Sequence, residues 1–121
     1  MATILVVEDE RSVLNSIGSV LKSEGHDVVL IEDCNAAMAT LKTQRFALVI
    51  SDIRLGPIDG IDILRESKSR HPETPVMLIS AYPTEQILRE AEELKVDRFM
   101  AKAFHVDEII NAVNTLLPAA T

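Results

Sequence analysis

Four short apolar runs in this sequence of 121 residues each end at polar side chains. Such runs are typical of buried β-strands. The polar residues after them offer carboxylates, a hydroxyl and an ammonium group, which together can hold a divalent cation and a phosphoryl group. They are Glu8 and Asp9 after residues 4–7, Asp52 after 47–51, Ser80 after 76–79, and Lys102 after 99–101.

The elements that must position these residues alternate between strand and helix. Apolar residues recur at steps of three and four at Val13, Ile17 and Leu21, which indicates a helix with Gly25 as its C′ residue. The other helices are predicted over roughly 35–44, after Gly60, after Thr84, and from Ile109 toward Pro118. Strands are predicted at residues 4–7, 27–31, 47–51, 76–79 and 98–101.

This alternation predicts a single doubly wound (βα)5 domain of the α/β class, with a five-stranded parallel sheet and helices on both faces. The first and third strands are almost wholly apolar, as central strands should be, whereas the second and fifth carry the charged residues Asp27, Asp97 and Arg98. The expected strand order is therefore 2-1-3-4-5, the flavodoxin-like arrangement. The carboxyl ends of its strands line one crevice, where the polar residues should converge.

The composition of the chain bears on whether it binds nucleic acid, crosses a membrane or is secreted. A formal net charge of −7 without a basic stripe argues against direct binding of nucleic acid. The apolar runs have the length of strands, so we expect neither a membrane span nor a signal peptide. Cys34 is the only cysteine, which suits a reducing compartment. We therefore expect a cytoplasmic protein with one domain over residues 1–121, in which 118–121 is either the native end or the start of a linker.

Taken in order, the polar residues resemble the receiver domain of response regulators in bacterial two-component systems. Each piece is common by itself, but the complete set, with each member at a strand end, is a specific signal. The resemblance covers essentially the whole chain. The residues that carry it are Glu8-Asp9, Ser51-Asp52 running on to Asp59-Gly60, Ser80-Ala81, and Phe99 with Lys102.

The resemblance implies that Asp52 accepts a phosphoryl group from a histidine kinase or a histidine phosphotransfer protein, with Mg²⁺ required and Mn²⁺ as a substitute. Asp9 and Asp52 would bind the metal directly. The backbone carbonyl of Arg54 would be a third ligand, and Glu8 would act through water. The domain would catalyse its own phosphorylation and slow dephosphorylation, and would not be an enzyme in the usual sense.

The resemblance also implies roles for three residues of the fourth and fifth strands. Lys102 would pair with Asp52 and then with the phosphoryl oxygens, and Ser80 would donate its hydroxyl to one of those oxygens. Phe99 stands at the family's aromatic switch position and would turn into the space that Ser80 leaves. The surface of the fourth helix, fifth strand and fifth helix would then change and control an effector domain, an output protein or a phosphorylation-dependent dimer.

Each of these residues also has a plain structural interpretation. Capping of a helix or turn would explain Glu8, Asp9, Asp52 and Ser80, solvation would explain Lys102, and core packing would explain Phe99. Capping does not require three carboxylates at neighbouring strand ends, so the functional interpretation is favoured for the acidic residues. For Phe99 the two interpretations have equal weight.

Two other classes of function remain open. An aspartyl-phosphate phosphatase or phosphotransferase acting on small substrates would usually carry a second carboxylate two residues after its nucleophile, where this chain has Arg54. An interaction module that works without phosphorylation would be expected to lack one or more pocket residues, and none is missing.

The sequence departs from the family pattern after Lys102. Receivers typically have proline next, after a cis peptide bond that aims the lysine, whereas this chain has Ala103. A cis bond before a residue other than proline costs about 2.5–4 kcal/mol. One charge contact from Lys102 to Asp52 is too weak to offset that cost, so a trans bond is expected.

Overall fold

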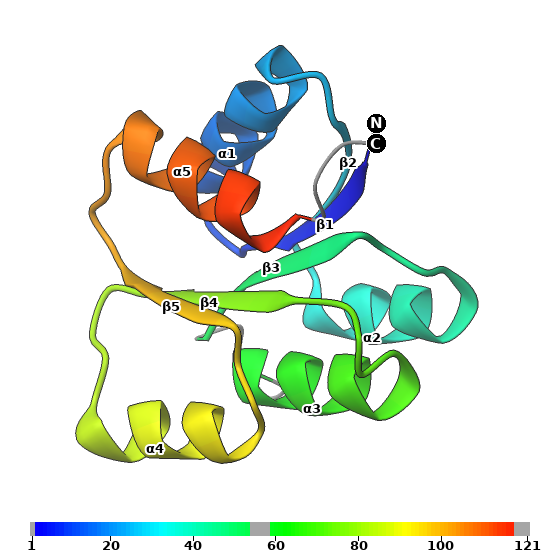
Figure 1. The fold of residues 1–121 in the computed structure, drawn as a ribbon, viewed down its shortest axis with the longest axis vertical. Helices are drawn as coiled ribbons and strands as arrows, with labels where there is room; N and C mark the ends of the chain where they lie inside the picture. The colour runs from blue at the N-terminus through cyan, green and yellow to red at the C-terminus, as the bar shows by residue number, and fades with distance from the viewer. Residues whose placement is uncertain (1, 54–58, 118–121) are drawn as a thin grey trace.

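A computed structural model describes residues 2–53 and 59–117. Five strands alternate with five helices along the chain, as the sequence predicts (Figure 1). In chain order the elements are β1 (Thr3–Val7), α1 (Arg11–Ser23), β2 (Asp27–Ile31), α2 (Cys34–Thr43), β3 (Leu48–Asp52), α3 (Gly60–Arg70), β4 (Val76–Ser80), α4 (Glu85–Glu93), β5 (Arg98–Ala101) and α5 (Val106–Leu116).

All five strands form one parallel sheet in the order β2-β1-β3-β4-β5, which confirms the predicted topology. The edge strands β2 and β5 are those with charged residues, and the central strands β1, β3 and β4 are almost entirely buried. The chain reverses direction across the sheet between β1 and β3. This is the switch point at which sheets of this kind bind ligands.

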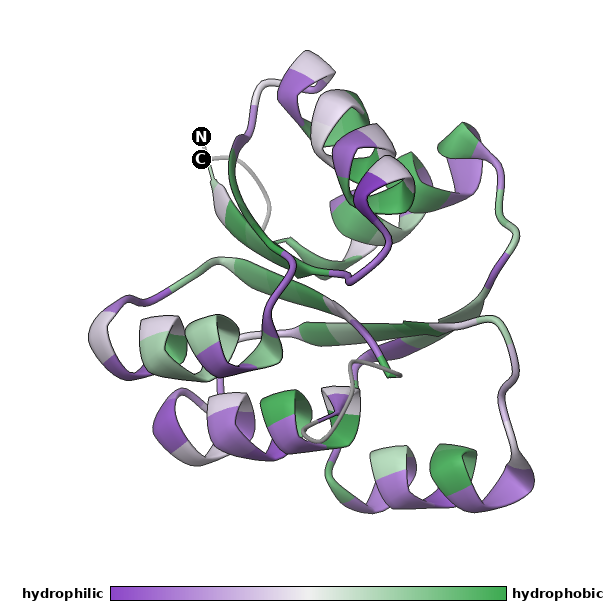
Figure 2. Cartoon of the chain, turned by 180° about the vertical axis from the view of Figure 1, so that it is seen from behind, coloured by the Kyte–Doolittle hydropathy of each residue, from purple (hydrophilic) through white to green (hydrophobic). Residues whose placement is uncertain are grey.

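Two apolar layers hold the helices to the sheet. Alternate residues of β1 point to opposite faces: Leu5 and Val7 join the layer under α2, α3 and α4, whereas Ile4 and Val6 join the layer under α1 and α5. The helices cover the two faces in the same grouping (Figure 1), and their apolar sides are turned to the sheet (Figure 2). Among the described residues, no helix is both long and apolar enough to cross a membrane.

The helix ends follow from local sequence. Gly25 lies just after the C-cap residue of α1. Its φ of +90° is a backbone conformation that other residues rarely adopt, as expected for a C′ glycine. The Thr84 hydroxyl accepts a hydrogen bond from the Ile87 backbone N–H at 3.2 Å, which confirms the predicted cap of α4. At the start of α3, Asp59 and Asp62 exchange side-chain-to-backbone hydrogen bonds in a capping box.

Two strands run one residue further than predicted. Asp52 is the last residue of β3 and Ser80 is the last residue of β4, and both still take part in the ladder opposite Ile79 and Ala101. Polarity alone suggested that each strand stops before these residues. Pairing with a neighbouring strand overrides that local signal, and it fixes the backbone of both polar residues.

The opposite end of the sheet is held by a polar network. One carboxylate oxygen of Asp97 accepts hydrogen bonds from the Lys68 ammonium at 2.7 Å and from the Val76 backbone N–H at 2.8 Å. The same ammonium donates to the Thr74 carbonyl at 3.1 Å. The network therefore joins α3 to the amino ends of β4 and β5, far from the strand ends that carry the candidate site.

Replacing Asp97 with Ala should lower the free energy of unfolding by about 1–3 kcal/mol, because Lys68 and the Val76 N–H lose a shared acceptor in a partly buried place. Urea denaturation measures the change. The matched control is Glu73→Ala, whose ion pair with Arg45 spans 3.7 Å between two exposed side chains and should matter by about 0.5 kcal/mol or less. Equal losses in both variants would show that the Asp97 network contributes nothing special.

Candidate functional site

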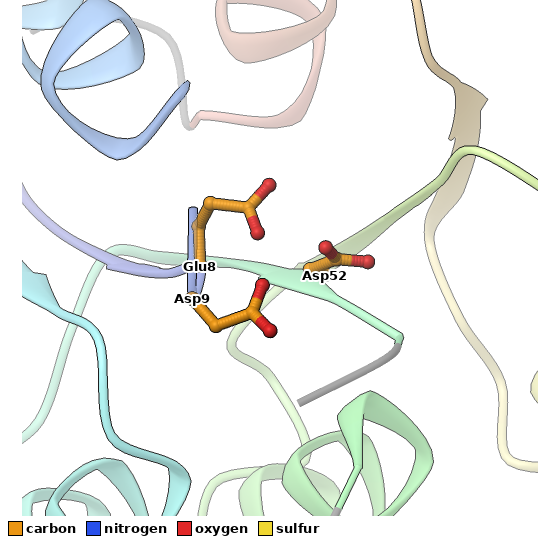
Figure 3. Close-up of side chains that lie close together, drawn as sticks. All are labelled: Glu8, Asp9 and Asp52. Carbon is orange, nitrogen blue, oxygen red and sulfur yellow. The ribbon is translucent and has the colours of Figure 1, made fainter. Parts of the chain in front are cut away.

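The ends of β1 and β3 bring three carboxylates together. Glu8 and Asp9 follow β1 directly, and Asp52 ends the adjacent strand β3. One oxygen from each of the three carboxylates lies within 4.8 Å of the others. Figure 3 shows the three side chains lying close together at these two strand ends. The sequence-based prediction that Glu8, Asp9 and Asp52 converge is therefore confirmed.

Lys102 brings the positive charge into this cluster from the loop after β5. Its Nζ lies 2.5 Å from Glu8 Oε1 and 2.9 Å from Asp52 Oδ2. Burial disfavours the charged ammonium, but the contacts with Glu8 and Asp52 outweigh burial and raise the pKa of Lys102 above its ordinary value. The solvated surface lysine that the sequence left as an alternative does not describe this residue.

Glu8 is the most enclosed of the three acids, with 0% of its surface exposed, whereas Asp9 is exposed. Burial raises the pKa of Glu8 from 4.5 to about 7, and its hydrogen bond with Asp52 adds to the rise; the contact with Lys102 acts in the opposite direction. Near neutral pH the Glu8 carboxyl, buried beside the Lys102 ammonium, is therefore only partly ionised.

The peptide bond between Lys102 and Ala103 is cis, so the expected trans bond is wrong. The expectation considered one contact of the lysine, with Asp52. In the structure the ammonium contacts Glu8 as well, and the Lys102 backbone N–H donates to the Ser80 carbonyl at 2.8 Å. Three separate contacts, not one, therefore hold this residue beside the strand ends.

Ser80 and Phe99 lie on the strands next to this cluster. Ser80 is 1% exposed, and its Oγ accepts a hydrogen bond from the backbone N–H of Tyr82 at 3.2 Å. Phe99 is partly buried and packs against the apolar layer under α4, which agrees with the core-packing interpretation of its sequence position. Tyr82 itself is 71% exposed.

Capping of α1 does not account for Asp9, and the turn near residues 56–57 that Asp52 could cap lies outside the described residues. The N-cap position of α1 belongs to Glu10, not to Asp9, and the N-cap position of α3 belongs to Asp59, not to Asp52. Glu8 does accept a long hydrogen bond of 3.3 Å from the Glu10 N–H. The predicted ligand carbonyl of Arg54 lies outside the described residues.

Sequence reasoning gave no role to Ser51. It is completely buried at the end of β3, and its hydroxyl donates to the carbonyl oxygen of Asp52 at 2.8 Å. A hydroxyl in an otherwise apolar central strand was the signal that could have drawn attention to it. Its contact with the backbone of Asp52 makes it part of the surroundings of the site.

The acidic cluster fits a small divalent cation. Mg²⁺ takes oxygen ligands at about 2.0–2.1 Å, so two ligands on opposite sides of the ion lie about 4 Å apart. The three carboxylate oxygens already lie within 4.8 Å of one another, which is close to this separation. The described residues of this cluster could therefore hold a metal ion.

Replacing Glu8 with Gln should stabilise the metal-free protein at about pH 8. The fold raises the pKa of Glu8 from 4.5 to about 7, so it binds this proton more tightly than the unfolded chain does, and the wild type loses stability as the pH rises between these values. Gln has no proton to lose. The stability difference should therefore grow through this window and then stay level, at on the order of 1–3 kcal/mol.

Urea denaturation in the presence of a chelator, at several pH values, measures this difference. The control Glu92→Gln changes an exposed carboxylate of α4 and should shift stability by about 0.5 kcal/mol or less at every pH. A Glu8→Gln protein that follows the wild type across the whole range would contradict the raised pKa.

Curated proteins that are similar to this chain in sequence include both short and long ones. Sporulation initiation phosphotransferase F of Bacillus subtilis is 30% identical over 115 residues, which cover 95% of this chain and 93% of that protein. The response regulator protein FleR of Pseudomonas aeruginosa is 30% identical over 112 residues, which cover 93% of this chain but 24% of FleR. The transcriptional regulatory protein FixJ of Bradyrhizobium diazoefficiens is 26% identical, and the match covers 57% of it. The chain thus spans about a quarter to just over half the length of FleR and FixJ.

Solved structures agree with the fold. The receiver domain of NtrX from Brucella abortus is 31% identical with a TM-score of 0.86, and the match covers 97% of this chain and 99% of that one. A CheY-like receiver domain protein from Methanospirillum hungatei reaches a TM-score of 0.92, over 95% and 92% of the two chains, at 19% identity, a likeness of fold alone.

The model of the response regulator receiver domain family matches residues 4–114. That range runs from β1 into α5 and includes every strand end that contributes to the acidic cluster. Receiver domains are signalling domains rather than enzymes in the usual sense. The predicted resemblance is confirmed: this chain belongs to the response regulator receiver domain family.

Proposed function

We propose that this domain is a switch that is turned on when Asp52 accepts a phosphoryl group. The observation that carries the proposal is the position of the Asp52 carboxylate, 2.9 Å from the Lys102 ammonium and within the cluster formed with Glu8 and Asp9. Asp52 is the last residue of β3, so its carboxylate lies at the edge of the sheet, and 8% of its side chain is exposed there. A carboxylate held beside a cation is suited to nucleophilic attack on phosphorus.

In the proposed reaction, a carboxylate oxygen of Asp52 forms a bond to the phosphorus of a phosphohistidine on a histidine kinase or a phosphotransfer protein. The bond from phosphorus to the histidine nitrogen breaks, and the imidazole leaves with the electron pair and takes up a proton. Lys102 then shares its charge with the new phosphoryl oxygens. Positioning and charge balance are the main contributions of the protein to such a transfer.

Mg²⁺, with Mn²⁺ as a substitute, would supply positive charge that offsets the repulsion between the carboxylate and the phosphoryl group. Asp9 and Asp52 would hold it directly, with the backbone carbonyl of Arg54 as a further ligand. Glu8 would act through water, because Glu8 is already buried against Lys102. An ionised Glu8 would make metal binding more favourable. Metal binding should therefore lower the pKa of Glu8, and deprotonation of Glu8 should raise the affinity for the metal.

For the output, Ser80 would release the Tyr82 N–H and donate to a phosphoryl oxygen, and Phe99 would fill the space that Ser80 leaves. The burial of Ser80 and the half-buried position of Phe99 on the neighbouring strand support this step. The surface of α4, β5 and α5 would then change and act on an effector domain, a separate protein or a second copy of the domain. We place these events in the cytoplasm of a bacterium, within a single domain.

Incubation with a small phosphodonor and Mg²⁺ should add one phosphoryl mass, and Asp52→Asn should abolish the addition, because an amide lacks the nucleophilic oxygen. Mass spectrometry of the intact protein measures it. The control is Asp27→Asn, at the exposed amino end of β2, which should be labelled like the wild type. Equal labelling of Asp52→Asn and wild type would sink the assignment. Steady release of phosphate from small esters would favour the phosphatase alternative.

Mg²⁺ should raise the thermal midpoint of unfolding, because a ligand that binds only the folded state stabilises it. The gain is about 1.4 kcal/mol when the Mg²⁺ concentration is ten times the dissociation constant. Asp9→Asn should blunt this response, since it removes a carboxylate from the cluster. Asp33→Asn, which alters the cap of α2, should keep the full Mg²⁺ response even if its own midpoint is lower. A midpoint indifferent to Mg²⁺ in the wild type would contradict the metal site.

A further inference from the structure

The backbone of Asp52 is enclosed more tightly than its carboxylate. Its carbonyl oxygen accepts the Ser51 hydroxyl at 2.8 Å. Gly60, the first residue of α3, lies against the same carbonyl. A Cβ atom on Gly60 would stand 2.3 Å from the Asp52 carbonyl oxygen and 2.8 Å from the Ile53 Cα, closer than real Cβ atoms come. Only glycine fits here without movement of the backbone.

Hydrogen bonds hold the start of α3 and the end of β3 in place, so Gly60 cannot easily move away from the Asp52 carbonyl. The Gly60 N–H donates to the Ile53 carbonyl at 2.8 Å, so the start of α3 is bonded to the end of β3. The Ile53 N–H donates to the Ile79 carbonyl at 3.0 Å, which extends the sheet past Asp52. The Asp59 capping box fixes the first turn of α3. A methyl group at Gly60 would therefore push on the Asp52 peptide itself.

We propose that Ser51 and Gly60 are positioning residues for phosphoryl acceptance. The Ser51 hydroxyl and the bare Cα of Gly60 both contact the Asp52 carbonyl and fix it, and the fixed carbonyl sets the direction of the Asp52 side chain toward Lys102 and the acidic cluster. Neither residue touches the reacting atoms; both act through Asp52. The proposal rests on the proposed function of Asp52.

Gly18 provides a matched control within the same chain. A Cβ there would also be too close to a neighbour, 2.7 Å from Leu30 Cδ1, but that atom is the end of a flexible side chain. Gly18 is buried on α1, against β2, and no atom of Asp52 is among its near neighbours. Gly18→Ala therefore perturbs the packing of α1 against β2 without pressing on the candidate site.

The experiment compares the wild type with Gly60→Ala, Ser51→Ala, Ser51→Thr and Gly18→Ala. Three quantities are measured: the urea midpoint, the Mg²⁺ concentration that gives half of the maximal thermal shift, and the rate of labelling by a small phosphodonor. A displacement of the nucleophile of about 1 Å should slow labelling by about ten- to a hundredfold in Gly60→Ala. The same variant should need several times more Mg²⁺.

Ser51→Ala should move both site measurements in the same direction by a smaller factor, and Ser51→Thr, which keeps the hydroxyl, should restore them toward the wild type. Gly18→Ala should leave both site measurements unchanged, whatever its effect on the urea midpoint. The proposal is overturned if folded Gly60→Ala matches the wild type in both labelling rate and Mg²⁺ requirement. It is also overturned if Gly18→Ala impairs these two site measurements as much as Gly60→Ala does. If Gly60→Ala does not fold, Ser51→Ala decides, and wild-type behaviour of that variant overturns the proposal. A wild type that takes up no phosphoryl group refutes the proposed function instead, and the Mg²⁺ comparison still decides positioning.

Discussion

Negative charge crowded together at the carboxyl ends of β1 and β3 is the constraint on which the rest of this structure depends. Three carboxylates converge within 4.8 Å, and one ammonium, from Lys102, is close enough to two of them to offset part of their repulsion. The raised pKa of Glu8, about 7, is the direct result of burial next to Asp52. Such a site gains free energy from a proton or a cation, so it is prepared to bind one. The same repulsion costs stability, and the fold must offset that cost elsewhere.

The apolar layers on the two faces of the sheet supply that stability, and they are also the part of the fold that sequence predicts best. Central strands that are apolar throughout and edge strands that carry charge determine the order β2-β1-β3-β4-β5. Parallel strands all end at one edge, so the topology by itself brings Glu8, Asp9, Asp52 and Lys102 together. These residues could be predicted because their convergence follows from strand order and from their place at the end of each run.

The remaining features depend on distances between elements that no local pattern encodes. Glu8 could be predicted as a ligand, but its complete burial depends on how the loop after β5 covers it. The number of carboxylates that Lys102 contacts depends on the same loop, which is why the peptide bond after it was wrongly expected to be trans. The approach of Gly60 to the Asp52 carbonyl is likewise a contact between α3 and β3. Local signals place residues at an edge; tertiary packing decides how closely they meet there.

Packing also connects the acidic cluster to the strand pair β4–β5 and to α4. The backbone N–H of Lys102 donates to the carbonyl of Ser80, so the cation that contacts Asp52 and the hydroxyl proposed to follow the phosphoryl group are joined by one hydrogen bond. Phe99 lies on β5, the strand that leads to Lys102, and packs under α4. A new charge on Asp52 would compete for the Lys102 ammonium and attract the Ser80 hydroxyl away from Tyr82 at the same time. Because both responses act on the ends of two adjacent strands, a local change in charge would reach α4 through the β4–β5 pair, without any need for the central sheet to move.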